Sequence, residues 1–248
     1  MATYHDLPPH ARQRLAVAER VAVLTGAGIS AESGVPTFRG PQGLWRSFRP
    51  EELATPEAFA RDPQMVWEWY DWRRGKVAAC RPNAGHTALA AMGVKVPSFT
   101  LITQNVDGLH RLAGSTDPVE LHGNIWQTRC LGCGKVQENR QTPLVPLPPT
   151  CPTCGGMLRP HIVWFGESLD PAILGRAQQV AGDADVFMVV GTSSVVWPAA
   201  GLAEVAAMNG ATIIEINVEE TPLTPDADVT LLGPAGYHLP RIVEGLWG

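Results

Sequence analysis

The sequence predicts an α/β protein with a doubly wound, Rossmann-like parallel sheet and a smaller domain built from a zinc ribbon and a helical insert. Three observations support this prediction. Short apolar runs alternate with amphipathic stretches, as expected when helices cover both faces of a parallel sheet. A glycine-rich turn follows the first apolar run. Four of the five cysteines form two Cys-x-x-Cys pairs in a segment that interrupts this alternation.

The apolar runs indicate buried strands, because they are rich in β-branched and aromatic residues and end at turn-forming or polar residues. The predicted strands are Arg20–Thr25, Phe99–Thr103, Val186–Val190 and Thr212–Ile216. The helical patterns between them are Ala84–Met92, Pro171–Val180 and Ala199–Met208. Asn209 and Gly210 then provide a typical helix end.

Two segments break the alternation, and we interpret both as inserts at one edge of the sheet. Residues 38–80 contain no predicted strand but a tryptophan-rich helix at Met65–Lys76. Residues 127–159 contain the cysteine pairs. The predicted organisation is a nucleotide-binding domain of residues 1–38, 80–126 and 160–248, a helical insert of residues 39–79 and a zinc module of residues 127–159.

The cysteine spacing predicts a structural zinc site. Cys130 and Cys133 are separated from Cys151 and Cys154 by seventeen residues, which suits a tetrahedral cage of four thiolates. Such a cage has no open position, so the metal stabilises the module and does not take part in chemistry. Disulfides and a nucleic-acid-binding ribbon are the alternatives, but residues 134–150 include only two basic side chains, too few for a phosphate-binding face.

The composition limits which classes of partner the protein is expected to bind. The chain has 248 residues, a net charge of −5 and a pI near 5.8, which argues against nucleic acid or an anionic membrane as the main partner. No apolar run reaches the about 18 residues of a membrane span, and the first residues lack a secretory pattern. Thiols kept for a metal suit a reducing compartment, so we expect a cytoplasmic protein. The fifth cysteine, Cys80, is interpreted as a small buried hydrophobe.

The turn after the first strand predicts a phosphate-binding loop. Its sequence from Gly26 to Ala31 fits G-x-G-x-x-A, in which the glycines allow a tight turn and the following helix start offers N–H groups to a pyrophosphate. The acidic residue expected about 20 positions later is absent, and Arg46 and Arg49 lie there instead. The chain is therefore not expected to be an ordinary dehydrogenase.

A polar cluster follows the second strand. Gln104, Asn105 and Asp107 lie where open α/β sheets bind ligands, and His122 with Gly123 comes shortly after. His122 is a candidate general base, with a pKa expected near that of an ordinary imidazole. By itself, a histidine such as His122 or His110 is more often a surface or hydrogen-bonded residue than a catalyst.

Taken together, these motifs resemble the sirtuins, which are NAD-dependent protein-lysine deacylases. The resemblance runs from about Arg20 to the C-terminus and requires eight motifs in register. In chain order they are Gly26-Ala27-Gly28-Ile29-Ser30, Val35-Pro36-Thr37-Phe38-Arg39, Gln104-Asn105-Val106-Asp107, His122-Gly123, the two cysteine pairs, Val163-Trp164-Phe165-Gly166-Glu167, Gly191-Thr192-Ser193-Ser194 and Asn217-Val218-Glu219.

The resemblance implies NAD as co-substrate and one structural zinc ion. NAD would lie between the two domains, with its phosphates on the first glycine turn and on Thr192 and Ser193, and its adenine ribose on Asn217 and Glu219. The implied NAD-binding residues are Gly26, Ala27, Gly28, Ile29, Ser30, Phe38, Arg39, Trp45, Gln104, Asn105, Val106, Asp107, Gly191, Thr192, Ser193, Asn217, Val218, Glu219 and Ala235.

The resemblance also implies the reaction and its catalytic residues. The acyl-lysine oxygen attacks the nicotinamide ribose and displaces nicotinamide. Asp107 and Asn105 would orient the carboxamide and a water, and His122 would deprotonate a ribose hydroxyl that attacks the acyl carbon. The products would be free lysine, nicotinamide and O-acyl-ADP-ribose. An acylated protein or peptide would bind as an added strand between residues 163–167 and 195–198, and the implied contacts are Val163, Phe165, Gly166 and Glu167.

The tryptophan-rich helix indicates which acyl groups the protein removes. Tyr70 and Arg73 are three positions apart and share a helical face, where a phenol and a guanidinium can hold a carboxylate. This Tyr-x-x-Arg resembles that of desuccinylase-like, class III sirtuins. An ordinary surface pair is the alternative, and Arg74 leaves open which guanidinium points inward. We therefore expect removal of succinyl or malonyl as well as acetyl groups.

Two other functions remain alternatives, namely a deacetylase or ADP-ribosyl transferase with the same NAD site, and a catalytically silent NAD-binding scaffold. No role in chemistry is expected for the remaining histidines. His5 and His10 lie in a terminal segment, His86 fits packing at a helix start, and His161 and His238 are predicted to lie in loops.

Overall fold

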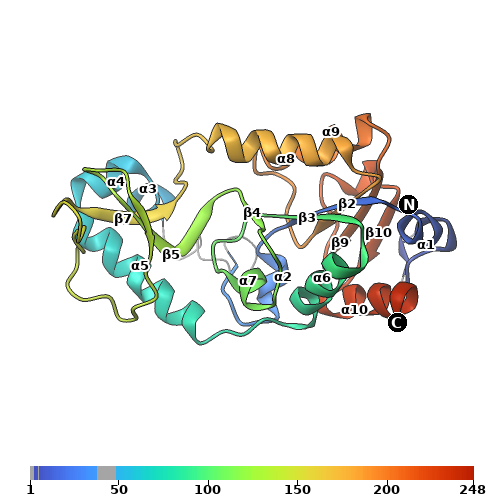
Figure 1. Ribbon diagram of the computed structural model, residues 1–248, viewed down its shortest axis with the longest axis horizontal. Helices are drawn as coiled ribbons and strands as arrows, with labels where there is room; N and C mark the ends of the chain where they lie inside the picture. The colour runs from blue at the N-terminus through green and yellow to red at the C-terminus, as the bar shows by residue number, and fades with distance from the viewer. Residues whose placement is uncertain (1–2, 5, 38–48) are drawn as a thin grey trace.

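The computed structural model describes residues 3–4, 6–37 and 49–248. A larger body carries the parallel sheet, and a smaller body holds the cysteine-containing segment together with the tryptophan-rich helix (Figure 1). Within the described residues, no helix combines the length and the apolarity needed to cross a membrane.

The larger sheet has seven parallel strands in the order β1-β10-β9-β8-β2-β3-β4 among the described residues. After β2 the chain adds β3 and β4 on one side, and it later adds β8, β9 and β10 on the other, so the strand order reverses beside β2. Ligands bind at such a reversal, outside the carboxyl ends of the strands. The strands are β1 (Thr3–Tyr4), β2 (Arg20–Thr25), β3 (Ser98–Thr103), β4 (Val119–Glu120), β8 (Val186–Val190), β9 (Thr212–Asn217) and β10 (Val229–Leu232).

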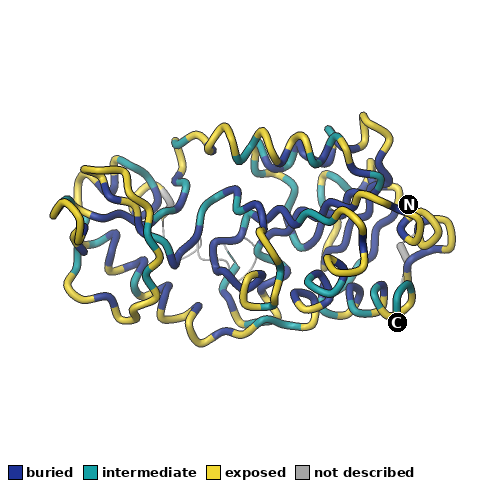
Figure 2. Tube along the Cα trace, viewed as in Figure 1, coloured by how far each residue is buried: buried dark blue, intermediate teal, exposed yellow. Residues whose placement is uncertain are grey.

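Alternate strand residues supply the two faces of this sheet. Val21 and Val23 pack into one apolar core, whereas Ala22 and Leu24 pack into the other. The sheet lies between the two helical layers, and its strands are largely buried (Figures 1 and 2). Helices α1 (Pro9–Ala16), α6 (Ala84–Lys95) and α10 (Ala235–Trp247) cover the first face, and α8 (Pro171–Asp183) and α9 (Gly201–Met208) cover the second.

The smaller body combines an antiparallel sheet with helices, and their apolar side chains share one core. That core brings Trp67 and Val77 of α5 together with Leu158 of β7 and with Cys130 and Cys151. The strands are β5 (Gly123–Cys130), β6 (Val136–Glu138) and β7 (Leu158–Ile162), and the helices are α3 (Pro50–Leu53), α4 (Pro56–Arg61) and α5 (Pro63–Ala78). Three short elements complete the described chain, namely α2 (Gly28–Ala31), α7 (Leu109–Leu112) and the 3-10 helix η2 (Thr224–Asp226).

Local sequence signals explain where two important helices begin. The Asp62 carboxylate accepts a hydrogen bond from Met65 N at 2.9 Å, and proline occupies the first turn of α5. Asn83 caps α6, and the His86 ring closes the reciprocal capping box by accepting from the Asn83 N–H at 3.3 Å. The packing role predicted for His86 at a helix start is confirmed.

The predicted strands agree with the structure to within one residue at each end. Two predictions about histidines were wrong. His161 lies in β7 and His238 in α10, not in loops. Both elements were missed because β7 contains a proline at position 160 and α10 contains one at position 240, and an internal proline weakens the pattern of a strand or a helix.

Candidate active site

Two glycine turns meet at the carboxyl edge of the larger sheet. The turn after β2 donates from Gly26 N to Val190 O at 3.0 Å and from Gly28 N to Gly191 O at 2.8 Å. A Cβ atom on Gly26 would lie 2.6 Å from the Thr192 side chain, and one on Gly28 would lie 2.7 Å from Gly191 O. The glycines are therefore required because the turns after β2 and β8 touch each other.

The backbone donors at this edge differ from the sequence-based expectation. In the first turn, the N–H groups of Gly26, Gly28, Ile29 and Ser30 are already bonded to carbonyl oxygens. Among the described residues, the N–H of Ala27 has no backbone acceptor, and neither do those of the adjoining Thr192 and Ser193. These three groups, not the start of α2, are the donors that a phosphate could use.

The ends of β3 and β9 are tied to the second glycine turn. Gln104 Nε2 donates to Thr192 Oγ1 at 2.9 Å, and Asn217 Nδ2 donates to Thr192 O at 2.9 Å. Thr192 therefore connects the predicted NAD-binding residue Gln104 with the predicted adenine-ribose residue Asn217. Val218 and Glu219 follow Asn217 and are exposed.

Asp107 and Asn105 form a buried network with Ser30. The Ser30 hydroxyl donates to Asp107 Oδ2 at 2.8 Å, and Leu109 N donates to Asp107 Oδ1 at 2.8 Å. Asn105 Nδ2 donates to Gly26 O at 2.9 Å and to Ser30 Oγ at 3.3 Å. Burial raises the pKa of Asp107, whereas both hydrogen bonds and the charge of Arg73 oppose that rise. The side-chain positions of this network are fixed before any ligand binds.

His122 has one ring nitrogen fixed and the other available as a base. Its Nδ1 lies 3.0 Å from Gln104 O. Because a carbonyl oxygen only accepts, Nδ1 must carry the proton, which leaves Nε2 unprotonated in the neutral ring. Burial lowers the pKa of His122, and the bond to Gln104 opposes this. The expectation of an ordinary pKa is therefore corrected downward, because the ring is largely removed from water.

Gly123 is required by the strand opposite it. Its φ is +78°, and a Cβ atom there would lie 2.1 Å from His161 O. The glycine after His122 therefore allows β5 to approach β7.

Two further histidines lie behind the network. The rings of His86 and His110 have their centroids 4.8 Å apart. His86 Nε2 lies 3.3 Å from Ser30 Oγ, and His110 Nε2 lies 2.9 Å from Thr25 Oγ1. Burial lowers the pKa of His86 to about 4 and that of His110 to about 3. Both rings are therefore neutral supports at neutral pH.

This arrangement is that of a known family. The Sir2 family profile matches residues 26–198, which include the glycine turns, His122 and the cysteine pairs. The chain belongs to the Sir2 family. It is 56% identical over 226 residues to a protein of Aquifex aeolicus named NAD-dependent protein deacylase, an alignment that covers 91% of this chain and 95% of that one.

Solved Sir2 structures share the fold over nearly the whole chain. A Sir2 homologue in complex with NAD superposes with a TM-score of 0.92 at 46% identity, covering 99% of this chain and 96% of that one. A complex of Sir2 with a p53 peptide and NAD⁺ superposes with a TM-score of 0.82 at 30% identity, covering 96% and 97% of the two chains.

The structure resolves which arginine of this Sir2 chain lies beside Tyr70. Arg73 is buried, its Cζ lies 4.9 Å from the centroid of the Trp69 ring, and its charge lowers the pKa of Tyr70 against the larger effect of burial, which raises it. Arg74 points elsewhere, because its Nη2 donates to Asn139 Oδ1 at 2.7 Å and to Gln141 O at 3.1 Å. Arg74 therefore holds α5 against the zinc module, and Arg73 is the arginine that lies near the predicted carboxylate-binding Tyr70.

The four cysteines form one compact cluster. All four sulfur atoms lie within 4.8 Å of one another, with Cys130 and Cys154 at 3.4 Å and Cys133 and Cys151 at 3.9 Å. A tetrahedral zinc with Zn–S bonds of about 2.3 Å would place its sulfurs about 3.8 Å apart. The cysteines are free thiols, so no disulfide competes for them. The cluster fits one structural zinc ion.

The predicted peptide-binding segment continues from β7. Val163 N donates to His122 O at 3.0 Å, which places the segment beside the candidate base. Phe165 and Gly166 are exposed, and Gly166 has a φ of +84°. Glu167 points back into the protein and pairs with Arg159, with Arg159 Nη2 and Glu167 Oε2 at 2.9 Å. Glu167 therefore supports the segment from behind.

Other predicted residues are placed as follows. Ala235 is buried at the start of α10, where Gly236 N donates to Glu32 Oε1 at 2.9 Å.

Phe38, Arg39 and Trp45 lie outside the described residues, so their predicted contacts with NAD stay predictions. Sequence reasoning missed the supporting roles of Ser30 and of the His86 and His110 pair, because no local pattern marks them.

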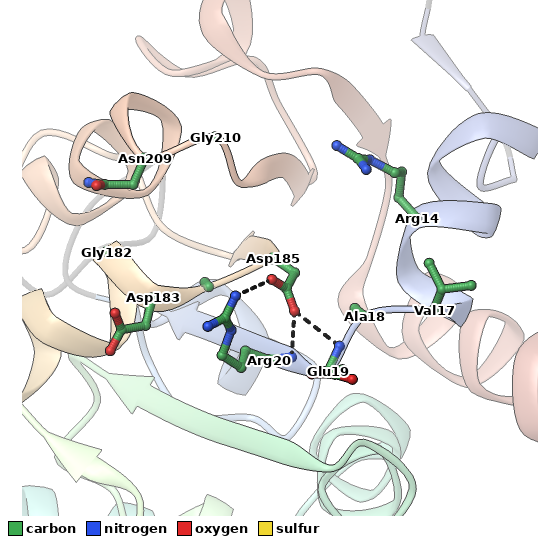
Figure 3. A pocket seen from close by; sticks show the side chains of 11 residues that line it. Arg14, Val17, Ala18, Glu19, Arg20, Gly182, Asp183, Asp185, Asn209 and Gly210 are labelled. Carbon is green, nitrogen blue, oxygen red and sulfur yellow. Dashed lines mark hydrogen bonds and ion pairs between the residues drawn. The ribbon is translucent and has the colours of Figure 1, made fainter.

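A separate cavity of about 450 Å³ lies at the opposite, amino edge of the sheet. It is lined by the segment before β2 and the segment before β8, and an exposed ion pair joins Arg20 Nη2 to Asp185 Oδ1 at 2.7 Å (Figure 3). Asp185 also accepts from the backbone N–H groups of Glu19 and Arg20. These bonds fix the start of two adjacent strands and involve none of the candidate catalytic residues.

Proposed function

We propose that this protein removes acyl groups from lysine side chains of proteins with consumption of NAD. The observation that carries the proposal is the fixed tautomer of His122, which leaves Nε2 available as a base. His122 is half-buried and lies next to Gln104, Asn105 and Asp107. Membership of the Sir2 family, and a relative named NAD-dependent protein deacylase, support the same conclusion.

The residues present fit NAD at the carboxyl edge. The backbone N–H groups of Ala27, Thr192 and Ser193, which have no backbone acceptor in the described part of the chain, would hold the phosphates. Asn217 and Glu219 at the end of β9 would take the adenine ribose. When bound, NAD supplies a ribose carbon from which nicotinamide leaves as the acyl-lysine oxygen attaches. The missing acidic residue after the first βα unit is then explained by ribose binding at β9.

The catalytic residues would each have one task. Asn105 and Asp107 would orient the nicotinamide carboxamide and a water, because Ser30, Gly26 and Leu109 hold both side chains in place. His122 Nε2 would accept a proton from a ribose hydroxyl, while Nδ1–H stays on Gln104 O. The lowered pKa of His122 keeps the ring neutral and ready to accept that proton at neutral pH.

The peptide substrate would bind between residues 163–167 and 195–198. Both segments lie outside the sheets and expose apolar side chains, with Phe165 46% exposed and Trp197 65% exposed. An extended peptide can add its backbone hydrogen bonds to such segments, with little selection by sequence. The solved Sir2 complex with a p53 peptide is consistent with a protein substrate of this kind.

We further propose that acidic acyl groups, such as succinyl or malonyl, are preferred over acetyl. Tyr70 and Arg73 are both buried in the smaller body, and burial lowers the pKa of Arg73, which reflects the cost of keeping its charge away from water. A carboxylate at the end of the acyl chain would offset that cost through paired hydrogen bonds. An acetyl group could enter the same pocket without using the fork.

The acyl preference is tested by kinetics on paired peptides that differ only in the acyl group. Tyr70→Phe combined with Arg73→Met should lower kcat/KM for the succinyl peptide by about 100-fold, the scale of a lost charged hydrogen-bond pair, and change that for the acetyl peptide by less than about threefold. Trp72→Phe, on the exposed side of the same helix, is the control. Equal losses on both peptides would rule out the fork.

Three outcomes separate the candidate functions in wild-type protein. Nicotinamide release that depends on succinyl-lysine supports the acidic-acyl deacylase. Release with acetyl-lysine only, or transfer of ADP-ribose to protein, supports the first alternative. Binding of NAD without turnover supports a scaffold, which the intact His122, Asn105 and Asp107 disfavour.

We also propose a cytoplasmic location and the domain division predicted above. The location is supported by a cluster of four free thiols suited to zinc in a reducing compartment. Fractionation of cells that express a tagged chain would test the location, and we expect to recover the chain in the cytosolic fraction.

A further inference from the structure

Trp164 is joined to the proposed acyl pocket by a hydrogen bond. Its Nε1 donates to the hydroxyl oxygen of Tyr70 at 2.9 Å. Both residues are buried, with Trp164 3% exposed and Tyr70 2% exposed, so water does not compete for the bond. The two residues are 94 positions apart in the sequence, so the contact exists only because the segment after β7 packs against α5.

The Trp164 indole is held by two ring contacts, and its backbone by a hydrogen bond. The Arg159 Cζ atom lies 3.5 Å from the centroid of the Trp164 ring, and the Phe59 ring lies 5.3 Å away on a centroid-to-centroid measure. Glu167 binds Arg159 through both oxygens and also accepts from Trp164 N at 2.8 Å. The position of the indole N–H is therefore fixed independently of Tyr70.

The direction of this hydrogen bond has a consequence for the phenol. An indole N–H can only donate, so it occupies one lone pair of the Tyr70 oxygen. The phenolic proton lies in the ring plane, where it has two possible positions. The Trp164 N–H occupies the space at one of these positions, so the proton takes the other. Among the described residues, Trp164 is the one hydrogen-bond partner of this hydroxyl, and the neighbouring Arg73 guanidinium has no acceptor atom. The phenolic O–H is therefore left for an acceptor brought by a ligand.

We propose that Trp164 is a positioning residue that sets Tyr70 as a hydrogen-bond donor to the acyl carboxylate. The inference rests on the acidic-acyl pocket proposed above. Trp164 itself does not touch the reacting atoms. Without its N–H, the Tyr70 hydroxyl could rotate so that its proton points away from the carboxylate, and selection for an acidic acyl group would weaken.

The test removes the N–H with two replacements, one of which keeps the shape of the ring. Trp164→Phe and a chain carrying 3-benzothienylalanine at position 164 both lack the donor, and the second keeps the bicyclic outline, so it remains informative if the phenylalanine variant folds poorly. Trp67→Phe is the matched control, because its buried indole N–H donates to Leu158 O at 2.8 Å and has no bond to Tyr70. The measured quantity is the ratio of kcat/KM for succinyl-lysine and acetyl-lysine peptides.

Both Trp164 replacements should lower this ratio about three- to tenfold, the scale of one ordinary hydrogen bond, through a higher KM for the succinyl peptide. The Trp67 variant should leave the ratio within twofold. In a Tyr70→Phe background, removing the Trp164 donor should cause no further change, because the two act through one hydroxyl.

Suppose that the wild type prefers the succinyl peptide while both Trp164 replacements keep the wild-type ratio of kcat/KM values. That result would overturn the role of Trp164 and leave the pocket proposal standing. Additive losses in the double variant would overturn it as well. A wild type without any succinyl preference would overturn the pocket proposal and this inference together.

Discussion

The two edges of the parallel sheet differ in how their polar groups are held. At the carboxyl edge, Asp107 and Asn105 are buried and have fixed partners, and Gly26 and Gly28 allow the turns after β2 and β8 to touch. At the amino edge, a cavity of about 450 Å³ is bordered by an ion pair whose side chains are 56% and 34% exposed. Prearranged buried polar groups, and not cavity volume, therefore mark the proposed site of chemistry.

The largest effect should come from removing the metal, which tests whether the carboxyl edge depends on the smaller body. Cys133→Ser with Cys154→Ser leaves two of four ligands, and β5 connects the cluster directly to His122. We expect loss of bound zinc and a fall in turnover of at least about 100-fold, because structural zinc supplies much of the folding free energy of such modules. Metal analysis and peptide assays measure both. Full activity in a zinc-free protein would contradict this prediction.

The next effect concerns stability and separates buried from exposed histidines. His110 has a pKa lowered to about 3, so the unfolded chain binds a proton that the folded chain does not once the pH falls below about 6.5. The stability contributed by the neutral ring is complete above that pH and is lost progressively toward pH 3. His86 acts in the same direction down to about pH 4.

Urea unfolding at several pH values measures this dependence. His110→Gln should reduce the loss of unfolding free energy between pH 6.5 and 4.5 by about 1.4 kcal/mol per pH unit. A pH dependence in His110→Gln equal to that of the wild type would show that burial does not lower the pKa of His110.

The smallest effect is expected at the amino edge. Asp185→Asn removes an exposed ion pair but can keep one acceptor for the backbone of β2, so unfolding free energy should fall by at most about 1 kcal/mol. Deacylation should change by less than twofold. Thermal unfolding and peptide kinetics check this, and a tenfold loss of activity would remove the distinction between the two edges.

The sequence was sufficient to predict what depends on local pattern. The apolar runs located β2, β3, β8 and β9, and the glycine turn, Gln104–Asp107 and His122 could be placed at strand ends from their order in the chain. The cysteine spacing predicted a cluster that the structure brings within 4.8 Å. The short strand β10 and the proline-containing helix α10 were missed, because four residues are too few for a clear period and proline interrupts a helical one.

The supporting contacts could not be predicted from the sequence. Ser30 and Asp107 are 77 positions apart, and Tyr70 and Trp164 are 94 apart. Which arginine faces Tyr70 depends on where Arg74 finds acceptors in the zinc module. The lowered pKa of His122 likewise follows from burial in the folded chain. Each of these properties depends on tertiary packing, which a single sequence does not display.

The central claim is that His122 is the base of an NAD-dependent deacylation, and His122→Ala tests it most directly. Wild type incubated with NAD and an acyl-lysine peptide should give nicotinamide, free lysine peptide and O-acyl-ADP-ribose in equal amounts. The variant should bind NAD with an affinity within about threefold of wild type and form deacylated peptide at least about 100-fold more slowly, the lower scale for loss of a positioned base. Deacylated peptide formed by the variant at the wild-type rate would contradict the account.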